Sequence, residues 1–397
     1  MVSVMLLTPW LVLGSIVALF VAWNNGSNNA ANMVGTAVGA RVISARKALV
    51  MASISCFVGA LLLGVYVTNT MMRGIVNVVL GLSKTTVTIG MISALIAAGL
   101  WTLVSSIMRV PMSVHVCVIG GITGFGLSLG LEFVNWGTIL RIFVAWMLVP
   151  FITAALAYAM LKILLWYLRL GKLEPFIMAV SFIVFFSPTV LTLLKAGLAF
   201  RYLTLMFLIS ICVGSLAALV TLILWRRVSG NRSSELEAMR ILLLESLIAM
   251  SISFGANDVA NAAGALAAVM YVQGLHNVGT ALRYSVLLSA IGLSLGIVLW
   301  GSRVIETVGE RITPLSPSSA FAAQLSAALV MLVVSRLGLP VSTSMAIVGG
   351  VIGVGIARGV QYIDLRIVVK IFIMWLIALP ITVMIAFTLT RLLTHLV

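Results

Sequence analysis

The sequence predicts an all-α polytopic membrane protein of about 12 transmembrane segments, built from two inverted repeats with broken or half helices. Three observations support this fold class. Apolar residues make up 62% of the 397 residues and charged residues only 8%. Apolar runs of membrane-spanning length follow one another along the chain, and a single offset aligns its two halves. A soluble domain could not bury this much apolar surface.

A helix that crosses a bilayer needs about 20 predominantly apolar residues. The first apolar run has no basic residues ahead of it and leads into a polar cluster, so we interpret it as a membrane helix and not as a signal peptide. The three cysteines are far apart and predict neither a metal site nor a disulfide framework. The predicted segments lie near residues 5–40, 45–66, 82–108, 111–131, 137–168, 175–195, 201–226, 240–272, 277–300, 318–337, 340–358 and 364–396.

The distribution of basic residues predicts the orientation. Roughly two thirds of the 24 Lys and Arg residues follow odd-numbered segments, and short cytoplasmic loops carry such an excess. We therefore expect an integral protein of the cell membrane with both termini outside and the polar stretch 226–240 in the cytoplasm. The net charge of +15 is scattered between apolar runs, so the lipid bilayer is an expected partner and nucleic acid is not.

Internal repetition follows from an offset of 229 positions. The offset superposes Asn28 on Asn257, Asn32 on Asn261, Gly35 on Gly264, Pro111 on Pro340, Ser113 on Ser342, Gly120 and Gly121 on Gly349 and Gly350, and Trp146 on Trp375. Corresponding segments are separated by seven crossings, and an odd number inverts one half relative to the other. The predicted units are a first repeat (1–170), two linking helices with a polar cytoplasmic loop (171–239) and a second repeat (240–397).

Two clusters of side-chain amides interrupt apolar segments. Asn24, Asn25, Ser27, Asn28, Asn29 and Asn32 form the first, and Asn257, Asp258 and Asn261 form the second. A single Asn could simply join two helices. Two matched clusters flanked by glycine instead indicate a binding site, where unwound helices expose backbone groups to ions. We predict substrate contacts from Asn28, Asn32, Asn257, Asp258 and Asn261.

A second matched pair of motifs is Pro111-Met112-Ser113 and Pro340-Val341-Ser342-Thr343-Ser344. Each opens a glycine-rich apolar run. Proline at the first helical position, with hydroxyls beside it, predicts a helix N-terminus that binds an oxyanion. The alternative is that these residues only cap a short helix. Their correspondence under the offset favours substrate contacts from Ser113, Ser342, Thr343 and Ser344.

These motifs resemble those of the inorganic phosphate transporter family of sodium- or proton-coupled symporters. The resemblance rests on Gly26-Ser27-Asn28-Asn29-Ala30-Ala31-Asn32, on Gly255-Ala256-Asn257-Asp258-Val259-Ala260-Asn261-Ala262, and on the stretches that begin GTAVGAR at Gly35, TPLSPSSAF at Thr313 and GLPVSTS at Gly338. It covers nearly the whole chain. It implies that phosphate binds between the halves near mid-membrane with cations beside it, and that the protein is a homodimer.

The chain departs from the family where coupling chemistry is expected. The family usually has Asp at the positions of Asn25 and Asn29, Glu near Cys56 and Gln324, and a Thr-His pair where this chain has His115-Val116 and Ser344-Met345. A carboxylate supplies the anionic oxygen that a dehydrated sodium ion needs, whereas an amide offers only a dipole. The sequence therefore predicts proton coupling or a reduced sodium stoichiometry.

The candidate coupling residues are Asn25, Asn29, His115, Asp258 and Gln324, and sodium, if used, would be bound by Asn28, Asn257 and Asp258. Asp258 is the main acidic candidate inside the membrane, because Glu245 is expected near the cytoplasmic interface. The alternative for Asp258 is a pairing with a neighbouring Asn, and for His115 an interior hydrogen-bond donor. The sodium ion or proton is the only expected cofactor.

Three functions fit these residues. The first is a symporter of inorganic phosphate that works by alternating access. The second is a proton-coupled carrier of sulfate or another tetrahedral oxyanion, since sulfate has no proton to donate to an acidic acceptor. The third is a non-transporting sensor or passive channel, which has no regulatory domain to support it. No nucleotide-binding loop, metal-ligand cluster or nucleophile with a base occurs, so we expect no enzyme.

Overall fold

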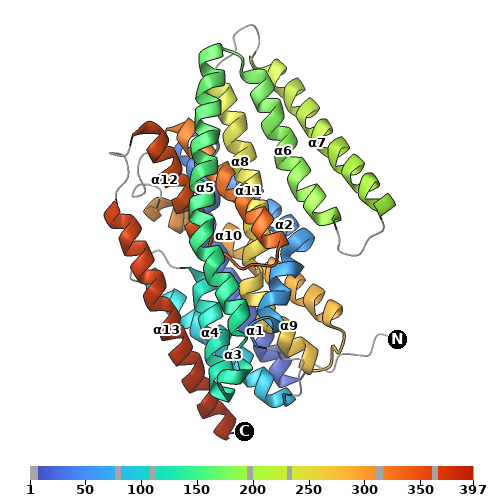
Figure 1. Cartoon of the computed structure of the whole chain (residues 1–397), viewed down its shortest axis with the longest axis vertical. Coiled ribbons are helices and arrows are strands. Elements are labelled where there is room, and N and C mark those ends of the chain that lie inside the picture. The colour runs from blue at the N-terminus through green and yellow to red at the C-terminus, as the bar shows by residue number, and fades with distance from the viewer. Residues whose placement is uncertain are drawn as a thin grey trace.

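A computed structural model describes residues 8–76, 82–107, 113–194, 200–229, 235–308, 316–359 and 365–396. These residues form an elongated bundle of helices (Figure 1). The helices are α1 (Pro9–Gly39), α2 (Ala45–Arg73), α3 (Lys84–Ile107), α4 (Val114–Leu129), η1 (Leu131–Phe133), α5 (Trp136–Leu170), α6 (Leu173–Leu193), α7 (Phe200–Ser229), α8 (Glu235–Asp258), α9 (Ala260–Val272), α10 (Val278–Val308), α11 (Pro317–Arg336), α12 (Thr343–Arg358) and α13 (Leu365–Leu396).

Within the described residues, ten spans are long and apolar enough to cross a membrane, with α8 and α9 together forming one of them. The other two apolar helices, α4 and α12, have 16 residues each. At 1.5 Å per residue they reach about 24 Å, less than the roughly 30 Å of a bilayer core. The ten spans and two half helices occupy the twelve predicted segments, so the predicted all-α membrane fold is confirmed.

Large apolar side chains point outward from several of the long helices. Phe151 on α5, Leu216 on α7 and Leu376 on α13 are each more than 60% exposed. In a chain of this hydropathy such surfaces face lipid. The helices α6 and α7, which link the two predicted repeats, lie side by side at one flank of the bundle, and α13 lies at another (Figure 1).

The half helices pack in a reciprocal pattern. The helix α4 packs against α13, and α12 packs against α5. A Cβ at Gly120 would crowd the carbonyl oxygen of Leu379, and a Cβ at Gly349 would crowd that of Pro150. The two glycines are 229 positions apart, and so are their partners Pro150 and Leu379, which is the predicted repeat offset. Two related halves would pack in this way.

Two more pairs of contacts repeat this pattern. The contact of Gly124 with Val383 corresponds to that of Gly353 with Ala154. The contact of Gly121 with Ala94 corresponds to that of Gly350 with Ala323. In both cases the glycines differ by 229 positions, and so do their partners. At the level of whole helices the reciprocity extends to α1 with α10 and α8 with α2: Gly26 contacts Leu293 and Gly255 contacts Cys56, where the glycines differ by 229 and their partners by 237. The inverted orientation and the boundaries 1–170, 171–239 and 240–397 stay predictions.

The prediction that the first amide cluster unwinds its helix is wrong, because α1 is continuous from Pro9 to Gly39. Its amides bond to one another along the helix: Asn29 Nδ2 donates to Asn25 Oδ1 at 2.9 Å, and Asn32 Nδ2 donates to Asn29 Oδ1 at 2.9 Å. Residues three and four positions apart are neighbours on a helix surface. The amides therefore satisfy one another without opening the backbone.

The second cluster lies beside a short interruption. α8 ends at Asp258 and α9 begins at Ala260, with Val259 between them at φ −58° and ψ −30°, still in the right-handed helical region. The helix is therefore interrupted at a single residue, Val259, and its backbone is not unwound there. Neither cluster presents an unwound backbone, and the side chains carry the chemistry of the site.

Candidate functional site

Asp258 lies at the point where side chains from both halves of the chain meet. Its carboxylate is only 3% exposed. Thr343 Oγ1, at the start of α12, donates to Asp258 Oδ1 at 2.8 Å, and Asn257 Nδ2 donates to the same oxygen at 3.2 Å. Asn25 Nδ2 on α1 donates to Oδ2 at 3.4 Å and to the Asp258 backbone carbonyl at 3.2 Å. The predicted convergence of these residues is present.

His115 and Asn261 complete this cluster. His115 Nδ1 lies 3.9 Å from Asp258 Oδ2 and 3.3 Å from Asn261 Nδ2. Both side chains are at most 1% exposed. Among the described residues, His115 Nε2 and Asn261 Oδ1 have no hydrogen-bond partner. A buried ring nitrogen and a buried amide oxygen beside a carboxylate are groups that could bind an ion or substrate.

Asn257 connects the end of α8 to the segment that precedes α12. Its Nδ2 donates to the backbone carbonyl of Val341, and its Oδ1 accepts from the backbone N–H of Val341 at 3.4 Å. One side-chain amide thus satisfies both polar groups of a buried residue between two helices. The contact holds the N-terminus of α12 against Asp258, so a movement of α12 relative to α8 would break it.

Gln324 on α11 joins the cluster through the amides of α1. Gln324 Nε2 donates to the backbone carbonyls of Asn32 at 3.3 Å and Met33 at 2.6 Å, and Gln324 Oε1 accepts from Ser246 Oγ at 2.9 Å. From Asn32 the hydrogen bonds continue through Asn29 and Asn25 to Asp258. The predicted coupling residues Asn25, Asn29 and Gln324 therefore form one polar path.

Asn28 belongs to a different part of the α1 surface. Its Nδ2 donates to Asn24 Oδ1 at 3.1 Å, and Asn24 Nδ2 donates to Thr102 Oγ1 on α3 at 2.9 Å. Asn28 and Asn32 are both half-buried. Thr102 could not have been identified from the sequence, because it lies in an apolar run and carries no motif.

The two serines of the second motif pair are helix caps. Ser113 Oγ accepts from Val116 N and Ser342 Oγ accepts from Met345 N, each at 3.4 Å. Both serines therefore cap their half helices, and their hydroxyls lie at the N-termini of these helices. Ser344 is half-buried in the first turn of α12.

The prediction of proline at the first helical position is wrong for Pro340. Ser342 is the cap of α12 and Pro340 lies two residues before it, outside the helix. Its carbonyl accepts a 2.9 Å hydrogen bond from Trp146 Nε1 on α5. A proline before the cap directs the chain into the helix without occupying its N-terminus. Pro111 and Met112 lie outside the described residues.

Glu245 is more buried than its predicted place near the cytoplasmic interface suggested. It is 6% exposed within α8, where Glu245 Oε1 accepts from Ser181 Oγ on α6 and from Thr221 Oγ1 on α7, the latter at 3.3 Å. It lies one residue from Ser246, which bonds Gln324. Position along the sequence could not reveal this, because the burial depends on how α6 and α7 pack against α8.

Known proteins resemble this chain over nearly its whole length. The sequence profile described as the phosphate transporter family matches residues 25–386. A chain from Thermococcus kodakarensis, provisionally named a phosphate permease, is 34% identical over 95% of this chain and 96% of its own length. A similarly named chain from Haemophilus influenzae is 31% identical over 94% of both. A solved structure titled a sodium-dependent phosphate transporter has 31% identity and a TM-score of 0.90, with 98% of this chain and 100% of that chain covered.

Proposed function

Because this chain belongs to the phosphate transporter family, we propose that it is a secondary symporter that carries inorganic phosphate across the cell membrane. The observation that carries the proposal is the meeting of side chains from both halves of the chain at Asp258. Asn25 comes from the first half of the chain, and Asn257 and Thr343 come from the second. A transporter whose site lies between two halves can expose it to one side and then the other.

The chemistry of the cluster suits a protonated oxyanion carried with a cation. Asp258 can accept a hydrogen bond from a phosphate hydroxyl, whereas the amides and His115 can donate to its oxygens. A cation beside the carboxylate would offset the repulsion between two negative charges. The solved relative is titled sodium-dependent, which favours sodium as that cation. The amide path from Asn25 to Gln324 offers dipoles where the family has carboxylates, which favours a low sodium stoichiometry or protons.

Alternating access would proceed through the half helices. Opening the site would separate the Asn257 side chain from Val341, and with it the start of α12 from α8. The reciprocal packing of α4 with α13 and α12 with α5 allows each half helix to move with the long helix that it contacts. By the distribution of basic residues, we place both termini outside.

The proposal is tested by uptake of radiolabelled phosphate into proteoliposomes. A sodium gradient and a proton gradient are imposed separately, each with and without excess unlabelled sulfate. Uptake driven by either gradient and unaffected by sulfate is the expected result. Strong competition by sulfate would favour the second candidate, an oxyanion carrier that does not use a substrate proton. Uptake that only equilibrates would contradict active transport.

The capping serines provide a second test. In the double variant Ser113→Ala/Ser342→Ala we expect a several-fold higher half-saturation concentration for phosphate, because the N-termini that lie beside the cluster lose their caps and their hydroxyls. The loss of a capping side chain costs about 1 kcal/mol per helix. Ser316→Ala is a matched control, since Ser316 caps α11 with the same 3.4 Å geometry. An unchanged half-saturation in the double variant would remove the helix starts from the substrate site.

A further inference from the structure

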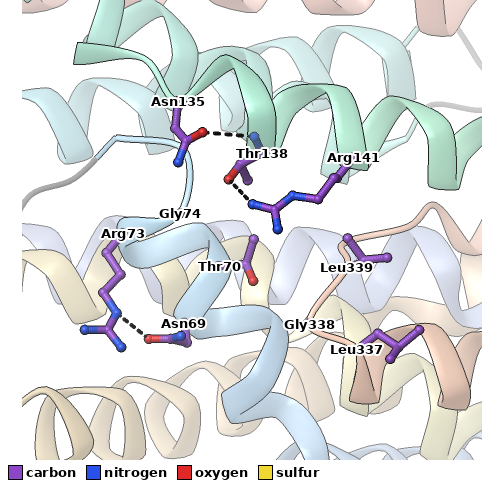
Figure 2. A pocket seen from close by; sticks show the side chains of 10 residues that line it. All are labelled: Asn69, Thr70, Arg73, Gly74, Asn135, Thr138, Arg141, Leu337, Gly338 and Leu339. Carbon is purple, nitrogen blue, oxygen red and sulfur yellow. Dashed lines mark hydrogen bonds between the residues drawn. The ribbon is translucent and has the colours of Figure 1, made fainter. Parts of the chain in front are cut away.

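A pocket of about 470 Å³ opens between α2, α5 and the segment that joins α11 to α12. Its polar walls come from the last turns of α2 and the first turns of α5, and residues 337–339 form its apolar side (Figure 2). The polar lining residues are Asn69, Thr70, Arg73, Asn135, Thr138 and Arg141. The pocket lies at the end of α2, on the face that the basic-residue distribution places outside.

The pocket is positively charged. Arg73 and Arg141 line it from opposite walls, and none of its ten lining residues is acidic (Figure 2). Arg73 Nε donates to Asn69 Oδ1 at 2.8 Å, and Arg141 Nη2 donates to Thr138 Oγ1 at 3.0 Å. Each guanidinium carries five N–H donors, so these neutral partners orient it and leave other donors for a ligand. Among the described residues, no carboxylate forms an ion pair with either arginine.

Helix electrostatics explain one of the two arginines but not the other. Arg73 is in the last turn of α2, where a cation interacts favourably with the negative end of the helix dipole. Arg141 is the sixth residue of α5, in the second turn, where the helix dipole no longer favours a charge of either sign. Its position is explained if an anion binds between it and Arg73.

The apolar wall of the pocket is continuous with the proposed transport site. Gly338 and Leu339 line the pocket. Val341 pairs with Asn257, and Thr343 donates to Asp258. Leu339 at the pocket and Thr343 at the buried carboxylate are therefore only four positions apart in the chain. A movement of this segment that breaks the Asn257–Val341 contact would also reshape the pocket.

We propose that this pocket is a binding site for a doubly charged phosphate group, held between Arg73 and Arg141 at the outer mouth of the transport site. Arginine suits this ligand because its planar donors match the oxygens of phosphate. The volume corresponds to about 16 water molecules at roughly 30 Å³ each, so the group can bind with part of its hydration shell. The proposal rests on the proposed phosphate transport, which it extends by a capture step before entry.

Uptake kinetics test the capture step. We expect Arg73→Gln/Arg141→Gln to raise the half-saturation concentration for phosphate about ten-fold or more, because the variant loses charge-assisted hydrogen bonds to the phosphate oxygens; ten-fold corresponds to about 1.4 kcal/mol of binding free energy. The maximal rate should stay within about two-fold, because neither arginine contacts Asp258. Arg73→Lys/Arg141→Lys should recover part of the affinity. Added salt should weaken uptake by the wild type more than by the Gln variant.

Lys84→Gln is the matched control for charge. Lys84 begins α3, the helix that follows α2 on the same face, and is exposed outside the pocket. We expect it to leave the half-saturation unchanged. An equal effect of Lys84→Gln and the arginine variants would show a general surface potential and would overturn the site. If the wild type does not transport phosphate at all, the proposed function fails first, so the two failures are distinguishable.

Free phosphate and phospholipid head groups both offer phosphate oxygens to arginine on the outer face, but free phosphate can carry two negative charges and the phosphodiester of a head group carries one. Phosphate binding to the purified protein is measured in nanodiscs of neutral phosphatidylcholine, and retention of anionic phosphatidylglycerol is measured by native mass spectrometry. Loss of phosphate binding in the Gln double variant assigns the pocket to the free ion. Loss of lipid retention alone assigns it to a head group. If the variant changes neither, the pocket is not a phosphate site.

Discussion

We expect Asp258→Asn to abolish accumulation of phosphate against a gradient while the protein stays inserted and folded. The substitution keeps the side-chain shape but removes the charge from a cluster whose other polar groups are amides, hydroxyls and His115. The oxygen that accepts from Thr343 and Asn257 can remain. The new amide nitrogen then faces the Asn25 amide nitrogen, so two donors meet in place of a donor and an acceptor.

The rate should fall at least about 100-fold, since a hydrogen bond to a charged group contributes on the order of 1.5–3 kcal/mol and Asp258 accepts several. The measurement is gradient-driven uptake into proteoliposomes at equal protein content. Glu174→Gln is the control, because Glu174 pairs with Arg226 at an exposed site and surface ion pairs contribute roughly 0–1 kcal/mol. Normal accumulation by Asp258→Asn would remove the coupling role from this residue.

The membrane fold could be predicted from the sequence because the thickness of the bilayer sets a minimum apolar length for every span. The twelve apolar runs correspond to ten spans and two half helices. Their ends could not be predicted as well. α2 extends to Arg73 where the apolar run ends near 66, since polar residues continue a helix as long as its backbone bonds are satisfied. This extension places Asn69, Thr70 and Arg73 at the pocket.

The site could be predicted in its residues but not in its conformation. Six of the predicted residues meet at one place: Asn25, His115, Asn257, Asp258, Asn261 and Thr343. Composition alone could not show that the amides of α1 hydrogen-bond to one another. The cluster predicted an unwound helix, whereas α1 is continuous. The burial of Glu245 could not be predicted for a similar reason, because its hydroxyl partners come from two helices that are distant in the sequence.

The reciprocal glycine contacts lead to the second large expected effect. In Gly349→Ala/Gly353→Ala the new methyl groups would enter the backbone of α5, where the added Cβ at Gly349 lies 2.7 Å from Pro150 Cα and that at Gly353 lies 2.7 Å from the Ala154 carbonyl carbon. The backbone of α5 cannot change rotamer as a side chain can, so α12 must move away from α5. Overpacking costs about 1–3 kcal/mol per site, and two sites approach the 5–15 kcal/mol of total stability.

We therefore expect a large loss of folded protein, measured by size-exclusion chromatography in detergent and by thermal unfolding. Gly35→Ala is the matched control, because a Cβ there meets nothing within 4 Å and alanine favours a helix by about 1 kcal/mol over glycine. Gly120→Ala/Gly124→Ala is the reciprocal variant against α13. Equal losses in both double variants would support two halves that exchange equivalent contacts. A loss in only one would mean that the sequence repeat is not an energetic repeat, and that one half helix moves more freely than the other.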